Sequence, residues 1–180
     1  MTTPTADKKS AIDTVRAALD DTGLDWHEEA ADRFTVDLPG EYKRHTATTL
    51  RVGEHSLQIS AFVVRHPDEN HAGVHRWMLE RNARLGGLAF TIDPVGDIYL
   101  IGRLPLAAVT EDEVDALLGQ VLHAADSSFN TLLELGFSTA IRAEWEWRLS
   151  RGEPTDNLAA FEHLRPELGR EEPEAGQRLR

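Results

Sequence analysis

The sequence contains no cysteine, which excludes a disulfide framework, thiol catalysis and zinc sites built on thiolates. No apolar stretch approaches the ~20 residues that a membrane-spanning helix requires. The most apolar region, IYLIGRLPLAAV, is interrupted by Arg103 and Pro105. The first residues, MTTPTADKK, have no apolar core of the kind that marks a secretory signal peptide. We therefore expect a cytoplasmic protein without a membrane segment.

Basic charge is scarce as well. The chain of 180 residues has 19 Lys and Arg against 31 Asp and Glu, which gives a formal net charge of −12. Such a charge repels phosphate backbones, so nucleic-acid binding would need a local basic patch. The candidates are the KRH run at 43–45 and the arginines within 76–84. The first is short and the second is interleaved with Glu80, so we expect no nucleic-acid partner.

The sequence also lacks the common motifs of enzymes. No serine lies in a GxSxG context, and neither GxGxxG nor GxxxxGK[ST] occurs. Paired acids such as those of 111–113 are better explained as helix caps and solvated faces than as catalytic carboxylates. We therefore expect no catalytic residue, no cofactor and no enzymatic activity.

What the sequence does contain is a clear succession of hydrophobic periods. Alternation predicts strands, and spacing of three to four residues predicts helices. Short joins between consecutive strands favour an α+β fold with a mostly antiparallel sheet, in the order α-β-β-β-α-β-β-α. Strands are expected at 33–38, 45–52, 56–64, 88–92 and 97–104, and helices at 8–22, 70–85, from 110 onward and at 138–151.

Composition divides the chain into four parts. An α+β domain is expected over residues 8–136, followed by a C-terminal helical extension over 137–165. Residues 1–7 are expected to be a flexible N-terminus. Residues 166–180 contain Glu, Arg, Gly and Pro with little to bury, which predicts a disordered tail.

Three stretches together resemble the YbjN domain family of bacteria: PDENHAGVHRWMLERNARL, LAFTIDPVGDIYLIGRLPL and TEDEVDALLGQVL. A fourth, ELGFSTAIRAEWEWRLSRGEPTDNLAAF, is similar to the extension of actinobacterial members. The resemblance extends over roughly residues 10 to 165. It implies a type III secretion chaperone-like fold, which often forms dimers, and a role as a regulator of sensory transduction. It supplies no catalytic residue.

The stretch HPDENHAGVHRW holds three histidines, His66, His71 and His75. Two histidines four positions apart on a helix can bind zinc, but the HExxH motif fails because Ala72 follows His71. Residues 68–70 suit a helix entrance, where caps and negative charge are favourable. We favour this interpretation, with exposed histidines and no metal. A metal site or acid–base site is the alternative.

The tryptophans near the C-terminus raise the question of a protein interface. Trp145 lies on one helical face with Leu149, whereas Trp147, two positions away, must face elsewhere. Trp147 either packs against the segment around Phe161 or contacts a second subunit or a partner. We expect Trp145, Trp147, Leu149 and Phe161 to contribute to such an interface.

These observations favour a non-enzymatic interaction or regulatory module that acts as a homodimer. The alternative is a binding protein that senses a small molecule or metal with its sheet face or with the region of His66, His71 and His75. An unrecognised hydrolase or transferase is a third possibility.

Overall fold

The computed structural model describes residues 6–167 of the protein. Contacts divide the chain into two compact units, Met1–Phe137 and Ser138–Arg180. The predicted disordered tail lies outside the described residues except for Pro166 and Glu167, which have no regular structure. Of the predicted flexible N-terminus, residues 1–5 likewise lie outside them.

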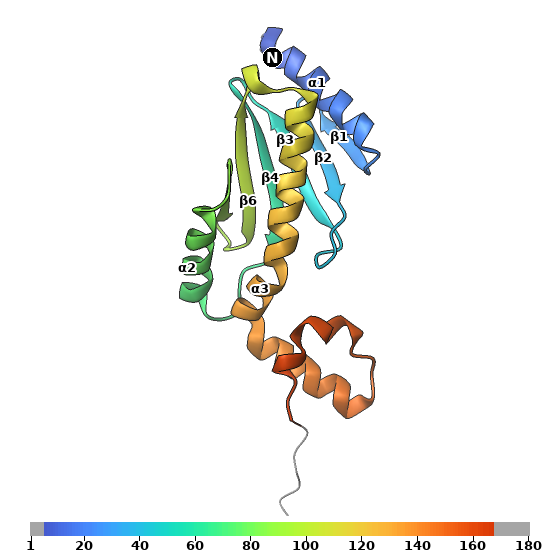
Figure 1. Ribbon diagram of the computed structural model, residues 1–180, viewed down its shortest axis with the longest axis vertical. Coiled ribbons are helices and arrows are strands. Elements are labelled where there is room, and N and C mark those ends of the chain that lie inside the picture. The colour runs from blue at the N-terminus through green and yellow to red at the C-terminus, as the bar shows by residue number, and fades with distance from the viewer. Residues whose placement is uncertain (1–5, 168–180) are drawn as a thin grey trace, which may run out of the picture. The chain divides into compact units, whose positions relative to one another are not determined.

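The first unit is built on one sheet of six strands, all of them antiparallel to their neighbours (Figure 1). The spatial order is β1-β2-β3-β4-β6-β5. The predicted antiparallel α+β architecture is therefore confirmed. The strands are β1 (Trp26–Ala30), β2 (Arg33–Leu38), β3 (Thr46–Val52), β4 (Ser56–Val64), β5 (Leu88–Ile92) and β6 (Ile98–Pro105).

The prediction of five strands is wrong by one, because β1 was missed. Its sequence, WHEEA, shows no alternation of apolar and polar residues, and all of it is exposed except the half-buried Trp26. As an edge strand, β1 pairs only with β2 and buries little of either face. The element order is thus α-β-β-β-β-α-β-β-α. Hydrophobic period cannot detect a strand that is held by backbone pairing at a sheet edge.

Helices cover one face of this sheet, which we call the inner face. Helix α3 (Glu111–Arg151) crosses in front of the strands in Figure 1, beside α1 (Ala6–Thr22). Helix α2 (His71–Asn82) packs at the β5 side, where the Trp77 and Phe90 rings lie 5.7 Å apart. The inner face and its helices form the core, which includes Val15, Leu19, Phe34, Leu50, Leu57, Ile59, Leu100, Val121 and Leu132.

Local sequence explains where the helices begin. The Thr110 hydroxyl accepts a hydrogen bond from the Glu113 backbone N–H at 3.2 Å, as the TEDE sequence predicts for a helix N-cap. Helix α1 begins at Ala6 and not at residue 8, so residues 6 and 7 of the predicted flexible N-terminus are helical. Asp7 explains the difference, since an acid in the first turn is favourable at the positive end of the helix dipole.

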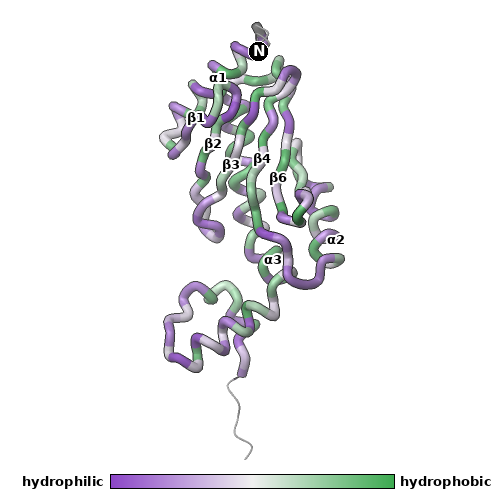
Figure 2. Tube along the Cα trace, turned by 180° about the vertical axis from the view of Figure 1, so that it is seen from behind, coloured by the Kyte–Doolittle hydropathy of each residue, from purple (hydrophilic) through white to green (hydrophobic). Residues whose placement is uncertain are grey.

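The opposite face of the sheet, which we call the outer face, carries no helix of the first unit (Figure 2). The strands β2, β3, β4 and β6 lie in front in this view. Along each strand the outward residues alternate with the core residues, and most of them are exposed or half-buried.

The second unit is built from the end of α3 and a 3₁₀ segment. Backbone angles depart from helical values at Phe137 (φ −144°, ψ 20°), where the first unit ends. Residues Asp156–Leu164 form the 3₁₀ segment η2, and not an α-helix. Leu158, Phe161 and Leu164 are buried there, so the unit has an apolar core of its own.

Candidate interaction surfaces

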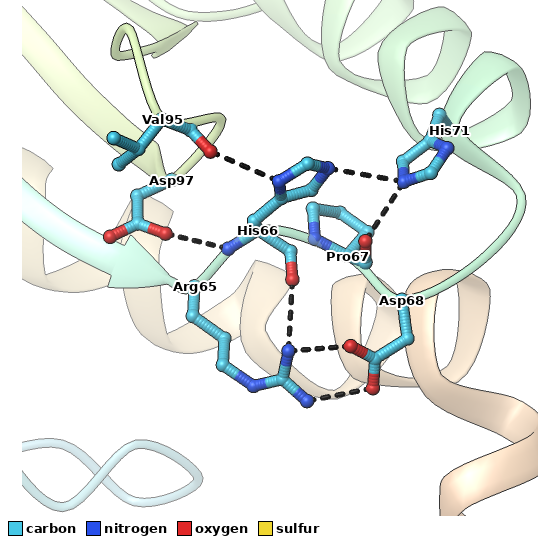
Figure 3. Close-up of polar contacts among 7 residues, drawn as sticks. All are labelled: Arg65, His66, Pro67, Asp68, His71, Val95 and Asp97. Carbon is cyan, nitrogen blue, oxygen red and sulfur yellow. Dashed lines mark hydrogen bonds and ion pairs between the residues drawn. The ribbon is translucent and has the colours of Figure 1, made fainter.

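The histidine-rich stretch forms a corner between β4 and α2 (Figure 3). The backbone N–H of His66 donates to Asp97 Oδ1 at 2.7 Å, and His66 Nδ1 lies 3.0 Å from the Val95 carbonyl oxygen. A carbonyl can only accept, so Nδ1 of His66 carries a proton. Nε2 of His66 lies 3.2 Å from Nε2 of His71. The side chain of His66 therefore joins the β5–β6 turn to the start of α2.

The second histidine completes a consistent set of hydrogen bonds. His71 Nε2 lies 2.9 Å from the Pro67 carbonyl oxygen, which also can only accept. With a proton on His71 Nε2, this atom donates to Pro67 and faces the free lone pair of His66 Nε2. Both nitrogen atoms of the His66 ring and Nε2 of His71 then have a hydrogen-bond partner. The pair therefore connects β4, the β5–β6 turn and α2 through three of its four ring nitrogen atoms.

The three histidines do not come together as a metal site. His75 is exposed on α2 and has no contact with the other two rings. Within residues 6–167, no group of three His, Cys, Asp or Glu side chains has the arrangement of metal ligands. The corner brings together His66 and His71 only.

An ion pair closes the corner. The Arg65 guanidinium donates to both carboxylate oxygens of Asp68, at 2.6 and 2.7 Å, and lies 4.4 Å from the centroid of the Phe137 ring. The hydrogen bond from Arg65 lowers the pKa of Asp68 below its ordinary value, and the same bond raises the pKa of Arg65. Both side chains are solvated, so the pair fixes geometry more than it stabilises the fold.

Residues 68–70 directly precede α2, as predicted for a helix entrance, but the side-chain cap predicted there is not made by Asn70. The backbone N–H groups of Asp68 and Glu69 both donate to the Gly136 carbonyl oxygen, and Asn70 Nδ2 donates to that of Leu135. These carbonyls precede the break at Phe137, where the helix supplies no regular donors. Asn70 occupies the N-cap position of α2 with φ 52° and makes no side-chain cap bond. The segment before α2 therefore also satisfies backbone carbonyls of α3 next to its break.

The predicted interface residues of the second unit divide into buried and exposed ones. Trp145 is 1% exposed, and its Nε1 donates to the Phe161 carbonyl oxygen at 3.1 Å. Phe161 is buried and Leu149 is half-buried. Trp147 is 46% exposed, with the Arg151 guanidinium 5.4 Å from its ring centroid. Of the four, Trp147 has the greatest apolar surface available for a partner.

The outer face of the sheet is the other large exposed surface. Phe62 and Tyr99 are neighbours across β4 and β6, with ring centroids 5.5 Å apart in an edge-to-face arrangement. Ile101 is 43% exposed beside them. A shallow groove of about 390 Å³ lies over β4, β6 and β5 and is lined by Gln58, Ser60, Ala89, Ile101 and Arg103, together with Ile59, Gly87, Leu88 and Gly102. Sequence reasoning mentioned this face only as an alternative binding surface.

Comparison with known proteins assigns the family. The YbjN family profile, described as "Putative bacterial sensory transduction regulator", matches residues 11–134, which is more than half of the chain. The chain belongs to the YbjN family. The resemblance predicted from the sequence is thereby confirmed.

Similar proteins of mycobacteria include two uncharacterised ones. A protein of Mycobacterium leprae (strain TN), described as uncharacterised, is 58% identical over 132 residues, which cover 73% of this chain and 72% of the relative. An uncharacterised protein of Mycobacterium tuberculosis (strain H37Rv) is 58% identical over 137 residues, covering 76% and 75%.

Solved structures show the same fold at low sequence identity. A chain of the ExsC–ExsE complex has a TM-score of 0.54 at 19% identity, and the match covers 69% of this chain and 95% of that one. The structure of YbjN from E. coli, described as a putative transcription regulator, has a TM-score of 0.50 at 15% identity. This match covers 65% of this chain and 89% of that one. A weaker likeness, with a TM-score of 0.45 at 12% identity, is to the type III secretion chaperone SycH of Yersinia pestis in complex with a fragment of YscM2, and it covers 66% of this chain and 96% of that one.

The predicted α+β fold of this YbjN-family chain is thus confirmed, since a chain of the ExsC–ExsE complex shares it. Identities below 20% carry the fold and no residue role. In the described part of the chain, 6–167, no helix has the length and apolar character to span a membrane.

Proposed function

We propose that this YbjN-family chain is a non-enzymatic interaction module that regulates a protein partner, or shields it as a chaperone does, in the cytoplasm. The observation that carries the proposal is the outer face, since six strands present one face to solvent while helices occupy the other. An exposed sheet face with Phe62, Tyr99 and Ile101 is a surface on which a second polypeptide can pack.

The absence of a catalytic role is supported by the corner around His66. The two ring nitrogens of His66 and Nε2 of His71 are engaged with one another and with backbone carbonyls of the same unit, as general acids and bases awaiting a substrate are not. The family description names a regulator and no reaction.

We further propose that the chain acts as a homodimer and that Trp147 lies at its interface. A large side chain with 46% of its surface exposed and a neighbouring guanidinium is typical of residues that contribute much of the binding energy in interfaces. Trp145 and Phe161 would fix the position of this interface, because their hydrogen bond ties the helix that carries Trp147 to the η2 segment.

Sedimentation velocity at micromolar concentration tests this assignment with two variants. Trp147→Ala should shift the protein from dimer to monomer with little loss of stability. Leu79→Ala is the matched control, because Leu79 is 70% exposed on α2, in the other unit. A monomeric wild type would overturn the homodimer. Dissociation of Leu79→Ala, with Trp147→Ala still dimeric, would assign the interface to α2 instead.

A small-molecule sensor is the second candidate function, and the groove over β4, β5 and β6 is the observation that favours it. Its apolar and polar lining residues would suit a compact amphipathic ligand. A screen of small metabolites by thermal shift, repeated with Ile101→Glu, tests this candidate. If a metabolite raises the melting temperature of Ile101→Glu as much as that of the wild type, the groove is excluded as its binding site.

A further inference from the structure

Three arginines form one row across the outer face of the sheet. The pairing register places Arg33 of β2 opposite Arg51 of β3, Arg51 opposite Gln58 of β4, and Gln58 opposite Arg103 of β6. All three arginines alternate with buried residues along their strands, and all three are exposed. We call Arg33, Arg51, Gln58 and Arg103 the arginine row.

In the described part of the chain, the positive charges of the row are not neutralised by neighbouring carboxylates. Among residues 6–167, none of the three arginines forms an ion pair or a hydrogen bond to a carboxylate, whereas Arg16, Arg65 and Arg148 each do. The chain as a whole carries 31 acidic residues. Like charges directly opposite each other on neighbouring strands destabilise a sheet. The fold therefore gains nothing from the position of Arg33 beside Arg51.

We propose that the arginine row binds an extended acidic segment of a protein partner, which deepens and rests on the interaction role proposed above. The spacing fits such a segment. Arg33 and Arg103 lie three strand spacings apart, about 14 Å. In an extended chain, side chains at positions i and i+4 point the same way and lie about 13–14 Å apart. Acids at i, i+2 and i+4 thus match the length of the row.

The surroundings favour a peptide over a nucleic acid. Next to the row, Ser60 and Ile101 face each other across β4 and β6, followed by Phe62 and Tyr99. These groups offer hydroxyl and apolar contacts to the residues between the acids. A nucleic acid extends its charge well beyond three arginines, and the acidic remainder of the protein would repel it. A short peptide with three acids meets the basic row alone.

A fluorescent peptide tests the proposal. The probe is a nine-residue peptide of alternating glutamate and threonine, and its partner probe has glutamine in place of glutamate. Binding to the full chain is followed by fluorescence anisotropy at low and at physiological ionic strength. We expect the glutamate probe to bind and the glutamine probe to bind at least about tenfold more weakly, with affinity falling as salt rises.

Variants locate the binding to the row. Arg51→Gln should weaken the glutamate probe about three- to tenfold, and the triple change Arg33→Gln, Arg51→Gln and Arg103→Gln should abolish binding. Arg84→Gln is the matched control, since Arg84 is an exposed arginine of the α2 side that forms no ion pair within residues 6–167. Urea unfolding of each variant confirms that it is folded.

Equal effects of Arg51→Gln and Arg84→Gln would overturn the proposal, because the protein would then respond to net charge alone. Failure of the glutamate probe to bind wild type would also overturn it. Tighter binding of a thymidine oligonucleotide of equal charge, sensitive to Arg51→Gln, would make the row a nucleic-acid site instead. A separate experiment tests the interaction role itself. That role is overturned if the outer-face variant Ile101→Glu binds every captured protein partner as well as the wild type does.

Discussion

The two faces of the sheet are built from the same strands, yet the inner face is apolar and buried while the outer face is largely exposed and carries charge. Leu50 and Arg51 are adjacent in β3, and one is fully buried under the helices while the other is exposed. The inner face is explained by burial of apolar surface, which drives folding. The outer face keeps three unpaired arginines in a row, an arrangement that costs stability. The difference shows that the inner face makes the fold, and it supports the proposal that the outer face binds a partner.

The largest expected effect separates adjacent residues on the two faces. Leu50→Ala should lower the free energy of unfolding by about 2–5 kcal/mol, because it leaves a cavity in the core. Arg51→Gln should leave it unchanged or raise it by up to about 0.5 kcal/mol, because it removes repulsion from Arg33. Urea denaturation of both variants measures the contrast. A loss above about 1 kcal/mol in Arg51→Gln would show that the arginine row is structural.

An intermediate effect is expected at the corner that ties the helical layer to the sheet. Gly96 has φ 93°, and a Cβ there would meet the His66 ring at 2.7 Å. Gly96→Ala should therefore lower the free energy of unfolding by about 1–3 kcal/mol. Gly86→Ala is the control, because a Cβ at Gly86 meets no atom within 4 Å. Equal stability of the two variants would mean that the corner adapts without strain.

The smallest expected effect is a pH dependence at the same corner. Arg65 lowers the folded-state pKa of Asp68 below 3.8, so this pair stabilises the fold at pH values above that of the unfolded carboxyl and stops doing so as pH falls through the folded pKa. Asp68→Asn should flatten the loss of stability between about pH 5 and pH 2. Arg65→Gln should flatten it to the same extent, and thermal unfolding across this range measures both. An unchanged slope in either variant would contradict the assignment.

Much of the fold follows from hydrophobic period. Alternation in RFTVDL and SLQISAFVV predicted β2 and β4 with the bounds that the structure has, because each strand buries one face. The WHEEA strand carries no such signal, since its position depends on pairing with β2. The sequence predicts a boundary between residues 136 and 137, next to the break in α3 at Phe137, but the partners of this break at residues 68–70 are remote in sequence.

The arginine row shows why binding surfaces are harder to predict than cores. Alternation alone places Arg51 and Arg103 on the polar sides of their strands. Their alignment depends on the register between strands, and a slip of one residue would turn a whole strand over. Similarly, helical spacing suggested that His71 would share a face with His75, whereas tertiary contacts pair His71 with His66.

Chemical-shift mapping of the full chain during titration with the alternating glutamate–threonine peptide tests the central claim most directly. The account predicts that the amide signals of Arg33, Arg51, Gln58 and Arg103, and those of their outer-face neighbours, shift with one common affinity while the signals of α2 stay in place. Shifts centred on α2 or on the segment around Trp147, with the outer strands unaffected, would contradict it.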